Sequence, residues 1–332
     1  MTRRWREIGI AVAGAGVVVA LVLVLLQVIG SDEPAEPVVM PTQTTSSTTS
    51  KKPEPPRPTQ WPRGLVVKVD NTSAARPHVG LRMANLIFVE PVEGGLTRMA
   101  AVYWGKRPGA IGPVRSARET DIQLLSQLKQ PILTFSGAAP EVYGLLNKAP
   151  LSQATPTTQP SAWYRVAGRT SPYNLFVNPA KLPKTKPVPS PLLFGKAPAG
   201  GKRTKRLHVS FQAASYDFRW SGTKQSWMIT LDGRPLTTVG HGQLGASTVV
   251  VQEVKIGDGK GVSDASGAAS PVAKTVGRGE ATVLRDGKAY ATEWSRPKLK
   301  QETAYRLENG KRVPFDKGRV MILLVPKFLA PK

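Results

Sequence analysis

The chain has 332 residues and a formal net charge of +24, from 46 Lys and Arg against 22 Asp and Glu, and it contains no cysteine. The absence of cysteine excludes disulfides, thiol chemistry and an acylated-cysteine lipid anchor. The positive charge attracts polyanions, although part of it lies in polar segments where it needs no partner.

The N-terminal segment is typical of a membrane anchor. Residues 8–29 carry no charge and, at about 1.5 Å per residue, would span roughly 33 Å, enough for a hydrocarbon core of about 30 Å. Arg3, Arg4 and Arg6 precede this segment and Asp32 and Glu33 follow it. The positive-inside rule therefore predicts a cytoplasmic tail at 1–7 and an exported remainder. The alternative is a cleaved signal peptide, whose apolar region is usually about 7–15 residues.

The expected compartment limits the partners. We expect a single-pass protein of the cell membrane, with its C-terminal ectodomain outside the cytoplasm. The cytoplasmic membrane is one expected partner, and an anionic wall polymer or another envelope protein is a second; nucleic acid is not expected on that side. Residues 30–62 are rich in Ser, Thr and Pro and poor in large apolar side chains, so we expect a disordered linker.

Residues 63–180 predict an α/β domain. Apolar runs at 65–69, 86–89, 99–104 and 131–135 indicate strands, and the nearly continuous runs suit strands covered on both faces. Ser116 and Glu119 have capping-box spacing, which predicts a helix that starts at Ser116 and stops before Pro131. A second helix is expected with Pro140 near its first position.

The C-terminal part predicts a different architecture. Residues 181–206 form a basic, proline-rich loop. From 207 to 332 we expect a mainly antiparallel β domain, with strands near 207–211, 227–231, 248–252, 281–284, 289–294 and 320–325. Asp232-Gly233 and Asp286-Gly287 lie between apolar runs and predict hairpin turns.

Several short sequences resemble the YerB-like family, whose members are exported bacterial proteins, often lipoproteins, with a two-part domain of unknown function. Residues 92–98 read VEGGLTR and residues 111–118 read IGPVRSAR. DN at 70–71, ARP at 75–77 and GL at 80–81 resemble the opening motif. Looser matches are GRG at 277–279, RDGK at 285–288, WSR at 294–296 and LVP at 324–326. The resemblance covers about 63–328 and implies a fold and a compartment, but no reaction.

Two features depart from that family. The cysteine that anchors many members is absent, and the apolar segment at 8–29 stands in its place. Residues 136–140 read SGAAP, where the family has more His and Gly, so a site that used such a histidine would be missing here.

Polar residues gather where the predicted strands end, which is where open α/β sheets bind ligands. Arginine binds phosphate and carboxylate through paired donors, and glycines allow a ligand close to the backbone. The candidate ligand-binding residues are Asp70, Asn71, Arg76, Glu90, Glu93, Gly94, Gly95, Thr97, Arg98, Arg115, Ser116 and Arg118. The alternative is a structural network in which these arginines pair with the nearby carboxylates.

The sequence offers little for catalysis. His78, His208 and His241 lack metal-ligand spacing, so we expect no metal site, and we expect no cofactor because no P-loop or dinucleotide motif is present. We predict a binding protein of the envelope rather than an enzyme. The alternative is a hydrolase of envelope glycan or phosphodiester that uses Glu90, Glu93 or Asp70.

Overall fold

The computed structural model describes residues 60–329 except 63, 185–186, 264–266 and 268. The predicted tail, apolar segment and almost all of the linker lie outside the described residues. In the described part of the chain, no helix has the length and apolarity needed to cross a membrane. Residues 53–332 group into one compact unit. Its described residues form mostly β-structure with two short α-helices.

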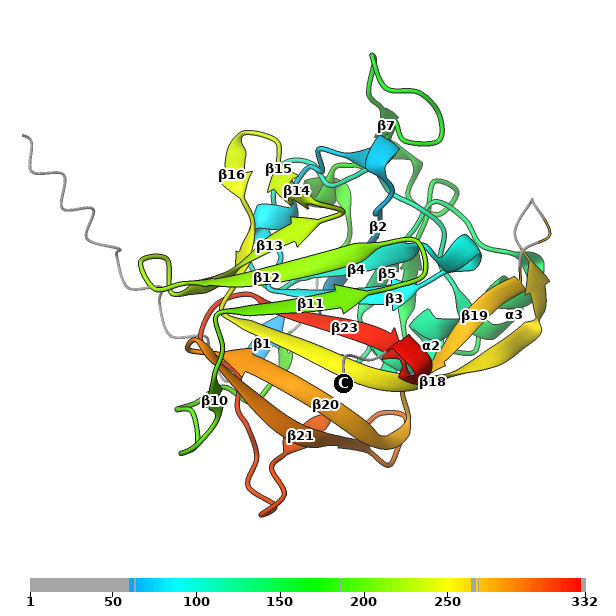
Figure 1. Cartoon of the computed structure of the whole chain (residues 1–332). Helices are drawn as coiled ribbons and strands as arrows, with labels where there is room; N and C mark the ends of the chain where they lie inside the picture. Colours follow the sequence, from blue (N-terminus) through cyan, green and yellow to red (C-terminus); the bar gives the residue numbers. More distant parts are fainter. Residues whose placement is uncertain (1–59, 63, 185–186, 264–266, 268, 330–332) are drawn as a thin grey trace, which may run out of the picture. The chain divides into compact units, whose positions relative to one another are not determined.

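Strands from both halves of the chain join in one twelve-stranded sheet (Figure 1). Its main path runs β10-β21-β20-β18-β23-β3-β4-β2-β5-β6, with β19 beside β18 and β22 beside β21. The strands from the first half are β2 (Leu65–Asp70), β3 (Leu86–Pro91), β4 (Thr97–Tyr103), β5 (Ile132–Thr134) and β6 (Ser152–Ala154). Those from the second half are β10 (Lys202–Arg203), β18 (Thr248–Ser263), β19 (Ala269–Lys274), β20 (Gly277–Arg285), β21 (Lys288–Arg296), β22 (Ala304–Arg306) and β23 (Val320–Pro326).

The last strand of the chain holds the two halves together. β23 lies between β18 and β3 and is parallel to both, with Met321 opposite Val249 on one side and Ile87 on the other. All seven of its residues are buried. The strands of the second half that join this sheet therefore continue it on the far side of β23.

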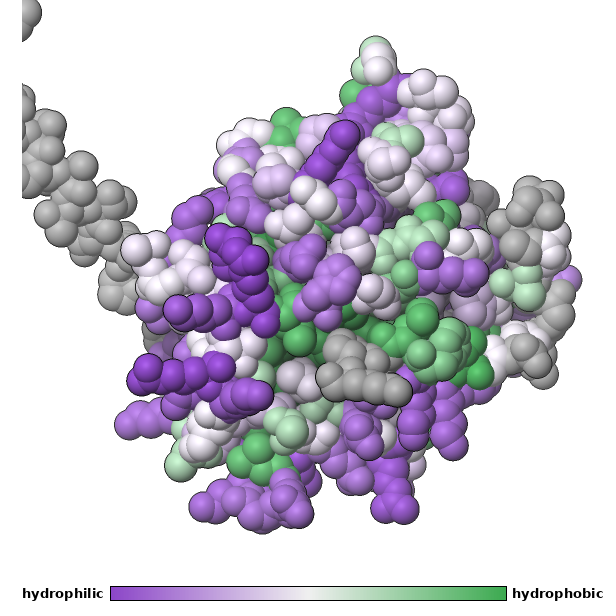
Figure 2. Space-filling view, viewed as in Figure 1, coloured by the Kyte–Doolittle hydropathy of each residue, from purple (hydrophilic) through white to green (hydrophobic). Residues whose placement is uncertain are grey.

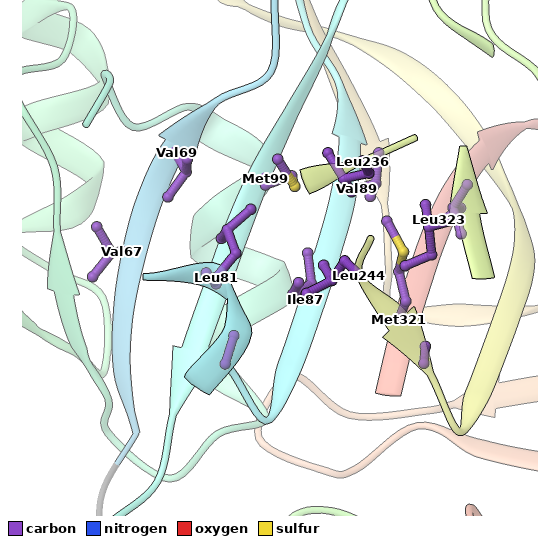
Figure 3. Packing of buried hydrophobic residues seen from close by; sticks show 14 of the residues in the cluster. Val67, Val69, Leu81, Ile87, Val89, Met99, Leu236, Leu244, Met321 and Leu323 are labelled. Carbon is purple, nitrogen blue, oxygen red and sulfur yellow. The ribbon is translucent and has the colours of Figure 1, made fainter. Parts of the chain in front are cut away.

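Two layers cover the central sheet. On one face lie α2 (Glu119–Ser126) and α3 (Pro140–Leu146), which contribute Leu124, Leu125, Val142 and Leu146 to one apolar core. On the other face lies a smaller antiparallel sheet, whose side chains join a second core. Figure 3 shows residues of that core from the central sheet, such as Val67, Ile87 and Met321, together with Leu236 and Leu244. That sheet contains β11 (Arg206–Ser210), β12 (Ser215–Ser221), β13 (Ser226–Leu231), β14 (Arg234–Pro235) and β17 (Gly245–Ala246).

Burial on both faces explains the continuous apolar runs of the central strands. Val66 and Leu86 face the helices, whereas Val67 and Ile87 face the smaller sheet, so consecutive residues of one strand enter different cores. The surface is different in character: the face in Figure 2 is mostly hydrophilic around a central apolar band.

Short two-stranded pairings complete the fold. They join β1 (Gln60–Pro62) with β9 (Pro187–Pro189), β7 (Trp163–Arg165) with β8 (Leu175–Val177), and β15 (Thr237–Thr238) with β16 (His241–Gln243). The segment predicted as a loop at 181–206 thus includes two short strands. Both predicted hairpin turns occur, since Asp232, Gly233, Asp286 and Gly287 all have positive φ.

The first helix begins later than the sequence predicted. The N-cap residue is Arg118, whose backbone N–H donates to Asp121 Oδ2 at 2.8 Å, and Ser116 lies outside the helix. Backbone hydrogen bonds hold residues 115–117 extended, because Arg115 N–H donates to the Lys68 carbonyl at 2.9 Å and Ala117 N–H donates to Gly137 at 3.0 Å. This pairing delays the helix by three residues.

Candidate functional site: an arginine cleft at the strand ends

A cleft of about 650 Å³ opens at one end of β2, β3 and β4. Because β4 is antiparallel to β2 and β3, its first residues lie beside their last ones, and Arg98 stands between Asp70 and Glu90 in the register. The segment before α2 closes another side of the cleft. Seven predicted site residues line this space: Asp70, Glu93, Thr97, Arg98, Arg115, Ser116 and Arg118. We call it the arginine cleft.

Two of the three arginines in the arginine cleft are held by carboxylates. Arg115 Nε lies 2.7 Å from Asp70 Oδ2, an ion pair without good hydrogen-bond geometry. Asp70 Oδ1 also accepts hydrogen bonds from the backbone N–H of Thr72 at 2.8 Å and from its hydroxyl at 2.6 Å. Asp70 is therefore fixed from two sides, and it fixes Arg115 in turn.

The second held arginine is Arg118, which grips Glu93 with two donors. Its Nε donates to Oε1 and its Nη2 donates to Oε2 at 2.8 Å, and the Ser270 hydroxyl adds a third hydrogen bond to Oε1. Burial by itself would raise the pKa of Glu93, but the bonds from Arg118 and Ser270 outweigh it and lower that pKa. Glu93 is therefore an ionised carboxylate with both oxygens engaged.

The third arginine has no such partner. In the described part of the chain, Arg98 forms no ion pair within 4.0 Å, and its one side-chain hydrogen bond runs from Nη1 to the Ser116 carbonyl at 3.1 Å. The side chain is only 6% exposed. Burial, with the charges of Arg118 and Arg115, lowers the pKa of Arg98 to about 10, so it stays protonated at neutral pH. Arg98 is a nearly buried cation whose Nε and Nη2 donors remain available to a ligand.

Behind the arginine cleft lies a fully buried charged cluster that the sequence analysis missed. The Lys68 ammonium donates to Glu90 and, at 2.7 Å, to Asp121, and all three side chains are 0% exposed. Burial and the nearby Asp121 raise the pKa of Glu90, and within the described residues Glu90 Oε2 has no hydrogen-bond partner. The signal was present in the sequence, because Lys68 interrupts an otherwise apolar strand.

Five predicted site residues lie outside the arginine cleft. The Asn71 amide donates to Thr97 and Tyr216, and Arg76 bonds to the Asn71 carbonyl and to Asp232, so both join the central sheet to the smaller one. Glu90 belongs to the buried cluster, whereas Gly94 and Gly95 line a neighbouring, smaller hollow beside Phe211 and Phe328.

The structure adds residues that sequence reasoning did not select. Tyr173, Thr72 and Leu96 line the arginine cleft, together with Ala138 and Val142. Tyr173 comes from a loop distant in sequence, so no local pattern could place it there. Among the described residues, no group of three or more His, Asp or Glu side chains is placed to hold a metal ion.

The described residues form a mostly β protein in which the two halves of the sequence share one sheet. The arginine cleft lies at the ends of strands of this sheet and is lined by three arginines. Residues 49–188 match the family described as "Protein of unknown function (DUF3048) N-terminal domain", and residues 207–322 match its C-terminal domain. Together these matches span more than half of the chain. The chain therefore belongs to the YerB-like family, as its motifs indicated.

Two similar proteins support this assignment. A Bacillus subtilis (strain 168) protein named "Putative lipoprotein YerB" is 40% identical over 62 residues, a stretch that spans 19% of this chain and 19% of that protein. The crystal structure of YerB from Bacillus subtilis matches with a TM-score of 0.68 at 20% identity, covering 80% of this chain and 91% of that one. This structural likeness concerns the fold alone.

Proposed function

We propose that this protein is a membrane-tethered protein of the cell envelope whose arginine cleft binds an anionic ligand outside the cytoplasm. The tether rests on the charge-free segment at 8–29 and on the arginines that precede it. The Bacillus relative carries the name "Putative lipoprotein YerB", which agrees with attachment to a membrane by another route.

The observation that carries the binding proposal is the state of Arg98. A buried cation without a carboxylate partner is costly unless another group compensates it. Arg115 and Arg118 stand beside it and are oriented by Asp70 and Glu93. Guanidinium groups bind phosphate and carboxylate oxygens through paired donors. An anion beside Arg98 would complete its hydrogen bonds and offset the repulsion among the three arginines.

The contacts of the carboxylates give less support to the alternative, a glycan or phosphodiester hydrolase. A general acid or base needs a carboxyl that can exchange a proton at the substrate. Glu93 has both oxygens engaged and a lowered pKa, and Asp70 is held by Thr72 and Arg115. Glu90 is buried with Lys68 and does not line the arginine cleft.

The test is calorimetric titration of the full chain, in a neutral detergent, with inorganic phosphate at low salt. We expect binding that weakens with added salt. Arg98→Met should weaken it about 10- to 100-fold, since a hydrogen bond to a charged group contributes about 1.5–3 kcal/mol. Arg234→Met is the matched control, because Arg234 is exposed on β14 and the charge change is the same.

Two outcomes would contradict the proposal. Either the wild-type protein binds no phosphate at low salt, or Arg98→Met and Arg234→Met bind it equally while both unfold like the wild type. The tether is tested separately, with alkaline phosphatase or a fluorescent protein fused to the C-terminus. Phosphatase activity supports the proposed orientation, and fluorescence confined to the cytosol overturns it.

A further inference from the structure

We propose that the arginine cleft selects a phosphodiester, a singly charged anion with substituents on both sides, over a phosphate monoester. This inference rests on the proposed function. Its first argument is the formal charge of the lining: three arginines and the carboxylates of Asp70 and Glu93 give a net charge of +1. A diester carries one negative charge at neutral pH, whereas a monoester carries about 1.5 to 2.

The buried charged cluster also favours a ligand with a single negative charge. The buried cluster holds one cation, Lys68, against the carboxyl groups of Glu90 and Asp121. Asp70 and Glu93 already occupy the donors of Arg115 and Arg118 that face them. A second negative charge on the ligand would therefore meet carboxylates without a free cation to balance it, and repulsion at such short range is strong.

The donors of Arg98 match the geometry of a diester. Nη1 is bonded to the Ser116 carbonyl, so Nε and Nη2 form the side of the guanidinium that is left for a ligand. These two parallel N–H groups pair with two oxygens of one anion. A phosphodiester has two non-bridging oxygens, and both would be satisfied by this single arginine.

The size and walls of the arginine cleft favour a substituted phosphate over a bare ion. A space of about 650 Å³ lies within the range of sites for whole small molecules. Its lining combines apolar side chains, such as Leu96 and Val142, with the hydroxyl-bearing residues Thr72, Ser116 and Tyr173. Such walls suit a polyol or sugar on each side of the phosphate. The headgroup of phosphatidylglycerol and a glycerol phosphate polymer both carry this chemistry.

The experiment compares glycerophosphoglycerol, a diester, with glycerol 3-phosphate, a monoester, by titrating the full chain in neutral detergent near pH 8. We expect the diester to bind about tenfold more tightly. Asp70→Asn is the decisive variant, because it removes one negative charge and raises the net charge of the lining to +2. In this variant, the ratio of diester affinity to monoester affinity should shift by about tenfold toward the monoester, which would reduce or reverse the preference. Asp217→Asn, at an exposed position on β12, is the control and should leave this ratio unchanged.

The possible outcomes distinguish a failure of diester selection from a failure of anion binding. Equal or tighter binding of glycerol 3-phosphate by the wild type overturns diester selection while anion binding stands. Binding of neither compound overturns both proposals. Displacement of glycerophosphoglycerol by short-chain phosphatidylglycerol or by soluble poly(glycerol phosphate) supports diester recognition and identifies the source, and displacement by neither overturns it.

Discussion

Replacing Lys68 with methionine tests whether the buried charged cluster holds the central sheet against α2. The carboxyl groups of Glu90 and Asp121 have no exposed surface, and the substitution removes the cation that both of them contact. Asp121 keeps the hydrogen bond from the Arg118 backbone N–H at 2.8 Å, but Glu90 has no other hydrogen-bond partner among the described side chains. Removing one partner of a buried ion pair costs about 3–5 kcal/mol, so we expect Lys68→Met to lose that much stability near neutral pH.

The loss should depend on pH in a defined direction. Without Lys68, the folded-state pKa of Glu90 rises further above its unfolded value. A folded-state pKa above the unfolded one means that the folded protein binds more protons, so stability falls as pH rises above the unfolded value of about 4.5. Lys68→Met should therefore be closer to wild type near pH 5 than near pH 8.

The assay is urea unfolding of the full chain in neutral detergent, followed by tryptophan fluorescence at both pH values. Lys298→Met, at an exposed position, is the matched control and should change stability by less than about 0.5 kcal/mol. The double variant Lys68→Met with Glu90→Leu should recover most of the loss, since it removes the unpaired buried charge as well. A loss below about 1 kcal/mol, or an equal loss at both pH values, would refute the reasoning.

Two further predictions concern a buried histidine and a glycine packed against a buried ring. His78 is fully buried and donates from Nε2 to the Asp70 carbonyl at 2.8 Å, and burial lowers its pKa to about 4. The unfolded chain therefore binds a proton at His78 more readily than the folded protein does. Acidification from about pH 6.5 to about pH 4 should for this reason remove up to about 3 kcal/mol of stability. His78→Gln should flatten that part of a stability–pH curve measured by urea unfolding, and an unchanged slope would disprove the assignment. Gly201 has a φ of +82°, and a Cβ there would lie 2.6 Å from the ring of the buried Tyr290. Gly201→Ala should therefore lower the melting temperature by several degrees, as about 1–3 kcal/mol of strain implies. Gly144→Ala is the control and should not lower it, because a Cβ at Gly144 meets nothing within 4 Å.

Much of the secondary structure could be predicted because its signals are local. The apolar runs of β2 and β3 and the two Asp-Gly turns need only neighbouring residues to be recognised. The start of α2 was mispredicted, since Ser116 has the right spacing for a cap but tertiary hydrogen bonds hold it extended. Helix propensity is overridden where the backbone forms hydrogen bonds with distant segments.

The convergence of Arg98, Arg115 and Arg118 was predictable in kind, because polar residues that follow buried strands meet at one edge of the sheet. The pairing of each arginine was not. Alternation along a strand places Lys68 and Glu90 on the helix face, but only the position of α2 brings Asp121 into contact with Lys68. The contact joins residues that lie 53 positions apart.

The sequence by itself determined the large positive charge, the absence of thiols, the charge-free segment at 8–29 and apolar strands such as β2, β3 and β23, because each depends on composition or on a short period. The tertiary structure decided that β23 joins both halves in one sheet. It also decided that Asp70 and Glu93 hold two arginines, while Arg98 is left without a carboxylate partner in the part of the chain that the structure describes. These outcomes depend on pairings between distant segments, which are set by the packing of whole strands and helices and leave no local trace in the chain.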